Sequence, residues 1–383
     1  MADSTRPVVE LSILGLQPRD GRPDDGSGFS SPTWTWPDDD AERPLARLLS
    51  RRYLAPSAHD EGEADCRFED PDRQALGILE ADPPAEIDAL TRALGDWCLG
   101  GGSRESFHER IEAWKAEGFT QLLCFDPIHL KAETDHAITL GPRFLALTAE
   151  ELDGLIGEMN AWLAQDGMRV ERIGRQLYLL ARAGEGGVGP ANVDLKRAGA
   201  PLACLLNRNA GVFLDEHHSD PILRQWLTEV QMWLYPQPFN DERAGRGQPI
   251  LNSFWPHGMA ELTYPLHDEA TEAGLIVSDS PAVLARHDAL AFEDASPRSL
   301  REAIEAGRSL HVVLSEAAWC RLEGDLGGFQ RELARIDDWL AGLLESVPGL
   351  NVRLLDGQGG VWRRENYLAR LWQRLWTGWR RRA

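Results

Sequence analysis

The sequence predicts an α/β protein built on an open sheet. Short apolar runs of strand length recur along the chain, and amphipathic segments of helical length separate them. The chain has 383 residues, of which 43% are apolar, so it can bury a sizeable core in one large domain or two ordinary ones. Because no internal repeat accompanies the alternation, we expect a single open sheet with inserted elements rather than a repeat architecture.

The strands are predicted from apolar runs bounded by turn residues. Residues 8–16 form the first run, and residues 17–40, rich in Asp, Gly, Ser and Pro, form a long loop after it. A hairpin is expected around Gly174. The predicted strands are residues 8–16, 75–80, 121–125, 137–140, 143–147, 169–173, 176–180, 274–277, 310–314 and 352–355.

The helices are predicted from apolar residues at spacings of three and four. Thr148 stands three residues before Glu151, which is the pattern of a capping box. Asp220 and Pro221 suit the cap and the first position of another helix. The predicted helices are residues 45–54, 84–99, 106–117, 148–164, 221–235 and 329–344.

The composition excludes several classes of protein. A formal net charge of −21 repels nucleic-acid phosphates and anionic lipid, so neither is a general partner. The five cysteines are scattered and form no C-x-x-C pair, which argues against a disulfide framework and a zinc ribbon. No basic-then-apolar signal opens the chain, and no stretch approaches the roughly 18 apolar residues of a membrane span. We therefore expect a cytoplasmic protein.

The last residues differ from the acidic body. Residues 362–383 hold seven arginines against the single acidic residue Glu365, a net charge of about +6. Their apolar residues share one helical face: Leu368, Leu371, Trp372, Leu375 and Trp376. This basic aromatic C-terminal helix either docks on its own acidic body or contacts the acidic surface of a partner or a membrane.

The second half of the chain resembles a known family. Residues 229–234 (Glu-Val-Gln-Met-Trp-Leu) lead into residues 238–243 (Pro-Phe-Asn-Asp-Glu-Arg) and then into residues 252–255 (Asn-Ser-Phe-Trp). This stretch resembles the RpfE-type regulatory family of bacteria, which is itself similar to the archaeal type of cofactor-independent phosphoglycerate mutase. Two departures stand out, because Gln237 replaces a histidine of the family pattern and His257 replaces a tryptophan.

The resemblance covers about residues 120 to 290 and implies a fold. That fold is an alkaline-phosphatase-like open sheet with an inserted smaller α+β domain. On this basis, residues 1–130 and 205–355 are predicted to form a discontinuous α/β core, and residues 131–204 the inserted subdomain. Residues 356–383 are predicted to carry the basic aromatic C-terminal helix.

The chemistry of such mutases is not evident in this sequence. The resemblance implies a serine nucleophile beside two metal ions held by Asp and His side chains. The first ligand should be an Asp-Gly at the end of the first strand, where this chain has residues 14–17, Leu-Gly-Leu-Gln. The one Asp-His pair, Asp135-His136, stands too early in the chain. We therefore expect no metal site, no cofactor and no catalytic residue.

Three places are candidates for ligand binding. In the first, Asn240, Arg243, Asn252 and Trp255 bind a ligand, or they fix loops and satisfy the main chain. In the second, Asp126 and His129 follow a strand and are an acid–base pair, or they form a turn around Pro127.

The third place is the segment of residues 278–281, Ser-Asp-Ser-Pro, where a strand ends and a helix begins. Open α/β sheets bind ligands at such points, and helix starts favour anions. Asp279 would oppose an anion, so simple capping of a helix is the other interpretation.

These observations favour a non-catalytic regulatory or ligand-binding protein on a degenerate phosphoglycerate-mutase-like fold. Its expected partner is a small anionic ligand or a protein. Two alternatives remain. One is an active metal-dependent phosphoglycerate mutase or another phosphoryl-transfer enzyme. The other is a membrane-surface or assembly factor that acts through residues 362–383.

Overall fold

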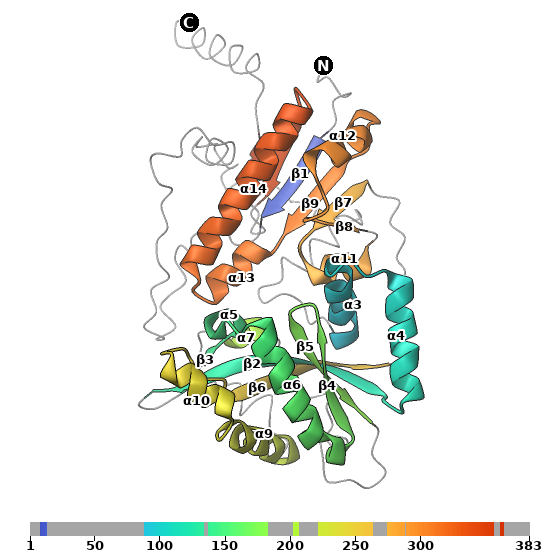
Figure 1. Ribbon diagram of the computed structural model, residues 1–383. Coiled ribbons are helices and arrows are strands. Elements are labelled where there is room, and N and C mark those ends of the chain that lie inside the picture. The colour runs from blue at the N-terminus through green and yellow to red at the C-terminus, as the bar shows by residue number, and fades with distance from the viewer. Residues whose placement is uncertain are drawn as a thin grey trace, which may run out of the picture.

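The computed structural model confirms an α/β protein with two separate sheets (Figure 1). It describes residues 8–13, 88–133, 137–182, 202–206, 221–262, 274–287, 289–355 and 361–363. Within these ranges, no helix has both the length and the apolar character needed to cross a bilayer. The predictions for residues 17–40, 45–54 and 75–80 lie outside the described residues.

The first sheet has six strands and is parallel except at one edge. Its order is β11-β10-β1-β9-β7-β8. The N-terminal strand β1 lies between β10 and β9 and runs parallel to both, and only β11 is antiparallel to its neighbour. The strands are β1 (Val8–Ile13), β7 (Leu275–Ser278), β8 (Ala289–Ala291), β9 (Leu310–Leu314), β10 (Asn351–Leu355) and β11 (Val361–Arg363).

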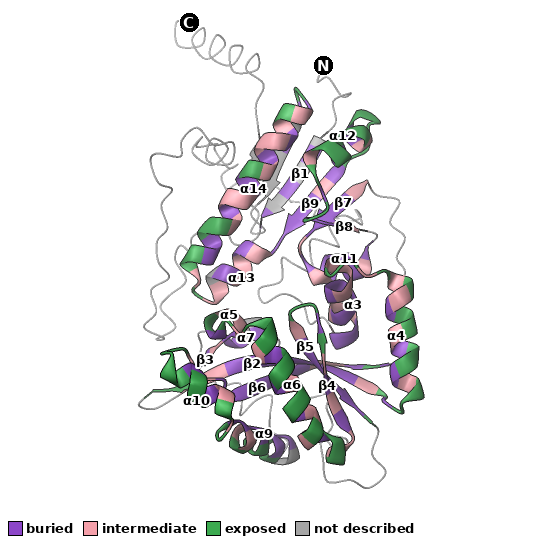
Figure 2. Ribbon diagram, viewed as in Figure 1, coloured by how far each residue is buried: buried purple, intermediate pink, exposed green. Residues whose placement is uncertain are grey.

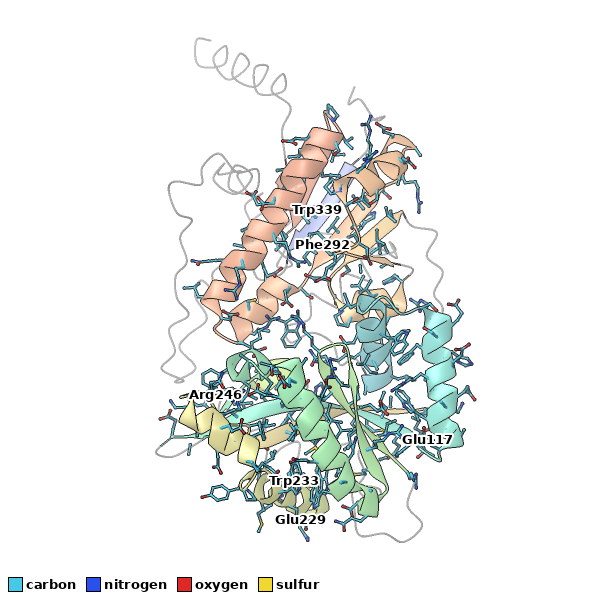
Figure 3. The ribbon with its side chains drawn as sticks, viewed as in Figure 1. Glu117, Glu229, Trp233, Arg246, Phe292 and Trp339 are labelled. Atoms are coloured by element: carbon cyan, nitrogen blue, oxygen red, sulfur yellow. The ribbon has the colours of Figure 1, made fainter. Side chains whose placement is uncertain are left out.

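One long helix covers this sheet and supplies much of its core. α14 (Leu326–Ser346) buries its apolar residues at spacings of three and four, as the sequence predicts. In Figure 3, Trp339 of this helix lies beside Phe292, and its indole N–H donates to the carbonyl of Ala295 over 2.6 Å. The other helices around this sheet are α11 (Pro281–Arg286), α12 (Pro297–Glu305) and α13 (Glu316–Leu322).

The second sheet is antiparallel and is organised by one long strand, β2 (Gln121–Ala132). β6 (Ser253–Glu261) pairs with one edge of β2, and β5 (Gln176–Ala181) and β3 (Ala137–Leu140) share the other edge. β4 (Met168–Ile173) completes the predicted hairpin with β5.

Alternate residues of β2 enter two different cores, because successive side chains of a strand point to opposite faces. Leu123 and Phe125 join the core under α6 (Ala149–Leu163) and α9 (Pro221–Leu234). Leu122 and Cys124 join the core under α3 (Ala89–Leu99) and α4 (Arg104–Ala116). Figure 2 shows the resulting buried sheet with helices exposed on their outer faces.

Short elements connect the larger ones: α5 (Pro142–Leu145), the 3-10 turn η2 (Ala164–Asp166), α7 (Leu202–Leu205) and α10 (Pro238–Gly245). The prediction of a strand over residues 143–147 is wrong, because Pro142 opens a helical turn and Ala146, with φ of 48°, ends it. The predicted capping box is confirmed: Thr148 Oγ1 accepts from the N–H of Glu151 over 3.1 Å, and Glu151 Oε2 accepts from the N–H of Thr148 over 2.9 Å.

The antiparallel sheet contains strands on both sides of the predicted boundaries at residues 130 and 205. Residues 131–204 contain β3, β4 and β5. β4 pairs with β5, and β3 and β5 both pair with β2, which also pairs with β6. The predicted boundaries assign most of β2 and all of β6 to the core. At the C-terminal end, residues 361–363 form strand β11 rather than the start of a helix, and the rest of the predicted C-terminal helix lies outside the described residues.

Contacts between α3 and α11 join the two sheets. Gly95 of α3 lies against the main chain of Pro281, so close that an added Cβ would lie 1.9 Å from the Pro281 carbonyl oxygen. Beside this contact, Arg104 donates to the carbonyls of Leu284 and His287 at the end of α11, over 2.9 and 2.8 Å. The two sheets therefore meet through main-chain contacts that tolerate little displacement.

Two glycines of α6 offer a test of helix propensity. Gly154 and Gly157 are exposed, and an added Cβ at either position would meet no atom within 4 Å. We expect Gly154→Ala and Gly157→Ala each to raise the free energy of unfolding by about 0.8–1 kcal/mol, because alanine loses less backbone entropy in a helix. Urea denaturation measures this change. The control, Gly101→Ala, should lower stability, because Gly101 has φ of 82°.

Candidate functional site at the junction of the two sheets

Asp279 lies at the carboxyl end of the parallel sheet, directly after β7. Its Oδ1 accepts from the N–H and the Oγ of Ser315, over 2.7 and 3.0 Å, and its Oδ2 accepts from the N–H of Glu316 over 3.3 Å. Burial raises the pKa of Asp279 to about 6, although these hydrogen bonds act to lower it. The carboxylate therefore caps α13, the helix that follows β9. Helix capping was one of the two interpretations of residues 278–281, but the helix that follows that segment is α11.

Glu323, just after α13, is held by α5 of the antiparallel unit. Its Oε2 accepts from the N–H of Arg143 over 2.8 Å, and its Oε1 lies 3.5 Å from the Arg143 guanidinium. Arg143 also donates to Glu316 over 2.5 Å, so one arginine joins two carboxylates across the junction. The Glu323 side chain is 5% exposed, and burial raises its pKa to about 7.

A second polar cluster lies on the face of β2 that α3 covers. Asp126 is fully buried, and Arg92 of α3 donates to both of its carboxylate oxygens, over 3.1 and 3.3 Å. The Nε2 of His257, from β6, lies 2.8 Å from Asp126 Oδ2. Burial alone would raise the pKa of Asp126, but the Arg92 charge and the His257 hydrogen bond lower it to about 2. Asp126 is therefore a permanent carboxylate.

A buried acid lies one helical turn further along α3. Tyr178 of β5 donates its hydroxyl to Asp96. Burial raises the pKa of Asp96 to about 6 and raises the pKa of Tyr178 well above its usual range. The positive charge of Arg92 acts on both Asp96 and Asp126. This network ties α3 to three strands of the antiparallel sheet.

The charge of one cluster acts on the other. Burial is the main cause of the raised pKa of Glu323, and the charge of Asp126 adds to it. The carboxylates of α13 and β2 are therefore within electrostatic reach of each other, although they belong to different sheets. We take Arg92, Asp126, Arg143, His257 and Glu323 as the centre of the candidate site and call this set the junction cluster.

The histidine beside Asp126 in the structure is His257, whereas the sequence analysis considered His129. Asp126 and His129 lie on one continuous strand, not on a turn, and an odd spacing of three puts their side chains on opposite faces. The ring of His129 lies with its Nδ1 2.9 Å from the carbonyl of Ile250. His257 is the residue that lies against Asp126, and the only sequence signal for it was the departure from the family pattern at that position.

Two other predicted binding residues have their polar groups occupied within the protein. The amide of Asn240 donates to the carbonyls of Leu234 and Leu251, over 3.0 and 2.8 Å, and accepts from the N–H of Leu251. Arg243 is buried, and its guanidinium donates to both carboxylate oxygens of Glu151, each over 2.9 Å. It also donates to the carbonyls of Pro249 and Leu145.

Asn252 and Trp255 also face inward. Asn252 accepts from the N–H of Leu130 over 2.8 Å and donates to its carbonyl over 3.0 Å, which extends the pairing of β2 with β6. Trp255 is 2% exposed and lies in a core cluster that reaches α7 and α13. The structure brings Asp126 alone of the six predicted residues into the junction cluster.

The junction cluster lacks an activated nucleophile among the described residues. Cys124 pairs in register with His257, which is the arrangement that a cysteine nucleophile would need. Burial raises the pKa of Cys124 to about 12, so it remains a thiol at neutral pH. Within the described ranges, no three His, Cys, Asp or Glu side chains gather as metal ligands. The described residues therefore do not fit a two-metal centre.

The pH dependence of stability tests the burial of Glu323. Its pKa is about 7 in the folded chain against an ordinary 4.5, so the folded state binds the proton more tightly. This contribution to stability is complete below pH 4.5 and is lost as the pH rises through 7. We expect Glu323→Gln to be more stable than the wild type at pH 8, by about 1–3 kcal/mol, and equal to it near pH 4. Urea titrations from pH 4 to pH 8 measure this difference. Glu345→Gln on the exposed face of α14 is the control, and an equal slope in both variants would contradict the prediction.

The fold and the site define an α/β protein in which a parallel and an antiparallel sheet meet at a buried, charged junction. No protein-family model and no curated protein matches the sequence. The solved structures that are similar to it include the following two. One is the PH0037 protein from Pyrococcus horikoshii, with a TM-score of 0.35 and 12% identity over 75% of this chain and 68% of that chain. The other is the cofactor-independent phosphoglycerate mutase from Thermoplasma acidophilum, with a TM-score of 0.32 and 15% identity over 94% of this chain and 89% of that chain. Similarity at this level carries no argument about function.

Proposed function

We propose that the protein is a non-catalytic regulatory or ligand-binding protein on a degenerate phosphoglycerate-mutase-like scaffold, of the RpfE type that residues 120 to 290 resemble. In this proposal the parallel sheet is the alkaline-phosphatase-like core. The inserted domain is the antiparallel unit, because β2 to β6 all lie between β1 and β7 along the chain. We also propose a cytoplasmic location, which agrees with the free thiols of Cys98, Cys124 and Cys320.

One observation carries the proposal: the acidic groups at the carboxyl end of the parallel sheet are engaged by the protein itself. Phosphoryl transfer needs carboxylates that stay open to metal ions, which offset the phosphate charge. Here Asp279 accepts main-chain hydrogen bonds at the start of α13, and Glu323 accepts one at the start of α5. Arg143 pairs with Glu316 and Glu323 across the junction. The carboxyl end of the parallel sheet therefore has a structural role, because its acidic groups connect the parallel sheet to the antiparallel unit.

A small anion is the ligand class that the junction cluster favours. The side chains of Arg92 and Arg143 are 17% and 27% exposed, so both arginines are partly accessible to solvent. Arginine presents several donors in a plane and can serve a carboxylate and an anion together. A protein partner with a carboxylate or phosphate group would meet the same two arginines.

Metal analysis and a turnover assay test the proposal on the full-length protein. We expect less than one metal ion per chain after purification, and no change in 3-phosphoglycerate by phosphorus NMR with magnesium, manganese or zinc. We expect calorimetry with inorganic phosphate or 3-phosphoglycerate to give binding that Arg143→Gln weakens. Two tightly held metal ions together with turnover would contradict the proposal.

The alternative is an active metal-dependent phosphoglycerate mutase or another phosphoryl-transfer enzyme. The observation that favours it is the pair of buried acids, Asp279 and Glu323, whose pKa values of about 6 and about 7 suit proton transfer near neutral pH. Turnover that is lost in both Asp279→Asn and Glu323→Gln would establish this alternative.

A further inference from the structure

An aromatic surface lies on α9, at the far end of the molecule from the parallel sheet (Figure 1). Met232 and Tyr235 are 70% and 86% exposed, although apolar side chains of this size are mostly buried. Beside them, Trp233 stacks on Trp162 of α6, with ring centroids 5.6 Å apart and planes 18° apart. We call these four residues the α9 surface. Figure 3 shows Trp233 on this helix near Glu229.

Carboxylates surround the α9 surface without cationic partners. Glu229 lies one turn before Met232 and Trp233, and Glu158 lies one turn before Trp162. Asp166 follows α6, and partial burial and then the charge of Glu229 raise its pKa. In the described part of the chain, none of these three carboxylates forms an ion pair. Their negative charge is therefore available to a cationic partner.

The chemistry of this surface selects one kind of occupant. Trp162 and Trp233 are half-buried, and a partly accessible tryptophan ring attracts a guanidinium, an attraction that nearby carboxylates strengthen. Exposed Met and Tyr side chains gain from contact with apolar and aromatic groups. The segment that binds this surface should therefore combine arginines with apolar aromatic residues. The acidic segments of this chain do not have that composition.

Residues 364–383 of the same sequence have this composition. They carry six arginines against the single acidic residue Glu365, together with the tryptophans Trp372, Trp376 and Trp379. The strand before them, β11, belongs to the parallel sheet, and α9 covers the antiparallel sheet at the opposite end of the molecule (Figure 1). We propose that the α9 surface binds residues 364–383 of a second copy of the chain.

Sedimentation velocity of the full-length protein tests this self-association. We expect association between about 1 and 100 μM that weakens at high salt, because charged pairs at a surface are screened. The double variant Met232→Ser with Tyr235→Ser should lower the association constant at least about tenfold. Glu229→Lys should also lower it, by repulsion of the arginines. The controls are Leu326→Ser and Asp338→Lys on α14, which make the same kinds of substitution away from the α9 surface. Both controls should leave the association constant unchanged.

A second set of experiments tests whether residues 364–383 are the segment that binds the α9 surface. Replacement of Arg380, Arg381 and Arg382 by glutamine should lower the association constant, and a synthetic peptide of residues 364–383 should dissociate the assembly. Circular dichroism of each variant checks that the fold is retained. A monomer at every concentration would overturn the proposal, and so would association that either the α9 variants or the arginine variants leave unchanged.

Discussion

Arg243→Met should lower the free energy of unfolding by about 3–5 kcal/mol, the cost of breaking a buried ion pair by removing one partner. Arg243 is 1% exposed, and its guanidinium serves Glu151 and the carbonyls of Leu145 and Pro249. Methionine keeps much of the volume but leaves these acceptors without a donor. The contacts join α10 to the start of α6 and to α5, so we expect all three to loosen together.

Arg246→Met on the same helix is the matched control for this prediction. The Arg246 side chain is 61% exposed and reaches only Glu242, over 3.2 Å, so its removal should change stability by no more than about 0.5 kcal/mol. Arg243→Lys should not rescue the loss, because one ammonium group cannot reach carboxylate and carbonyl acceptors in three directions. Urea denaturation measures all three variants. Equal effects of Arg243→Met and Arg246→Met would refute the structural role of Arg243.

Gly95→Ala should lower the free energy of unfolding by about 3 kcal/mol, at the upper end of the cost of overpacking. The new Cβ would lie 1.9 Å from the oxygen and 2.5 Å from the Cα of Pro281. Both are main-chain atoms, so no rotation of a side chain can relieve the clash. α3 and α11 must separate, and this movement displaces Arg92 from the junction cluster and Asp96 from Tyr178.

Thermal denaturation and hydrogen exchange check this result. We expect faster exchange in α3 and α11 and little change in α14, which lies on the parallel sheet away from the contact. Gly154→Ala makes the same substitution inside a helix that has open space around it, and it should raise stability instead. A Gly95→Ala variant as stable as the wild type would mean that the two helices are not in contact.

Most helices and strands could be predicted from the sequence, because their periodicity is local. The face of α9 formed by Leu223, Trp226, Leu227, Val230 and Leu234 is buried as expected. The Thr148 capping box formed because all of its donors and acceptors lie within four residues. The strand predicted over residues 143–147 was wrong, since a short apolar run fits a strand or a helical turn equally well. β6 was missed because Asn252, Ser253, Pro256 and Gly258 interrupt its apolar pattern.

The candidate site could be predicted only in part. Asp126 was identified, but the sequence offered His129 as its nearest histidine, and the strand places that ring on the opposite face. The amides of Asn240 and Asn252 bond to the main chain, and Arg243 bonds to main-chain carbonyls and to the side chain of Glu151. Arg92, Arg143 and Glu323 carried no local signal, because each acquires its role from residues that are distant in the chain.

By itself, the sequence determined the acidic charge, the α/β class and the amphipathic faces, all of which depend on composition or on spacing within one element. Only the tertiary structure decided that His257 meets Asp126 across 131 residues, and that Arg143 joins α5 to α13 across 173 residues. Burial raised the pKa of Glu323, whereas the charge of Arg92 and the hydrogen bond with His257 outweighed burial and lowered the pKa of Asp126. The reason is physical: desolvation and charge pairing depend on neighbours in space, and only the folded chain fixes those neighbours.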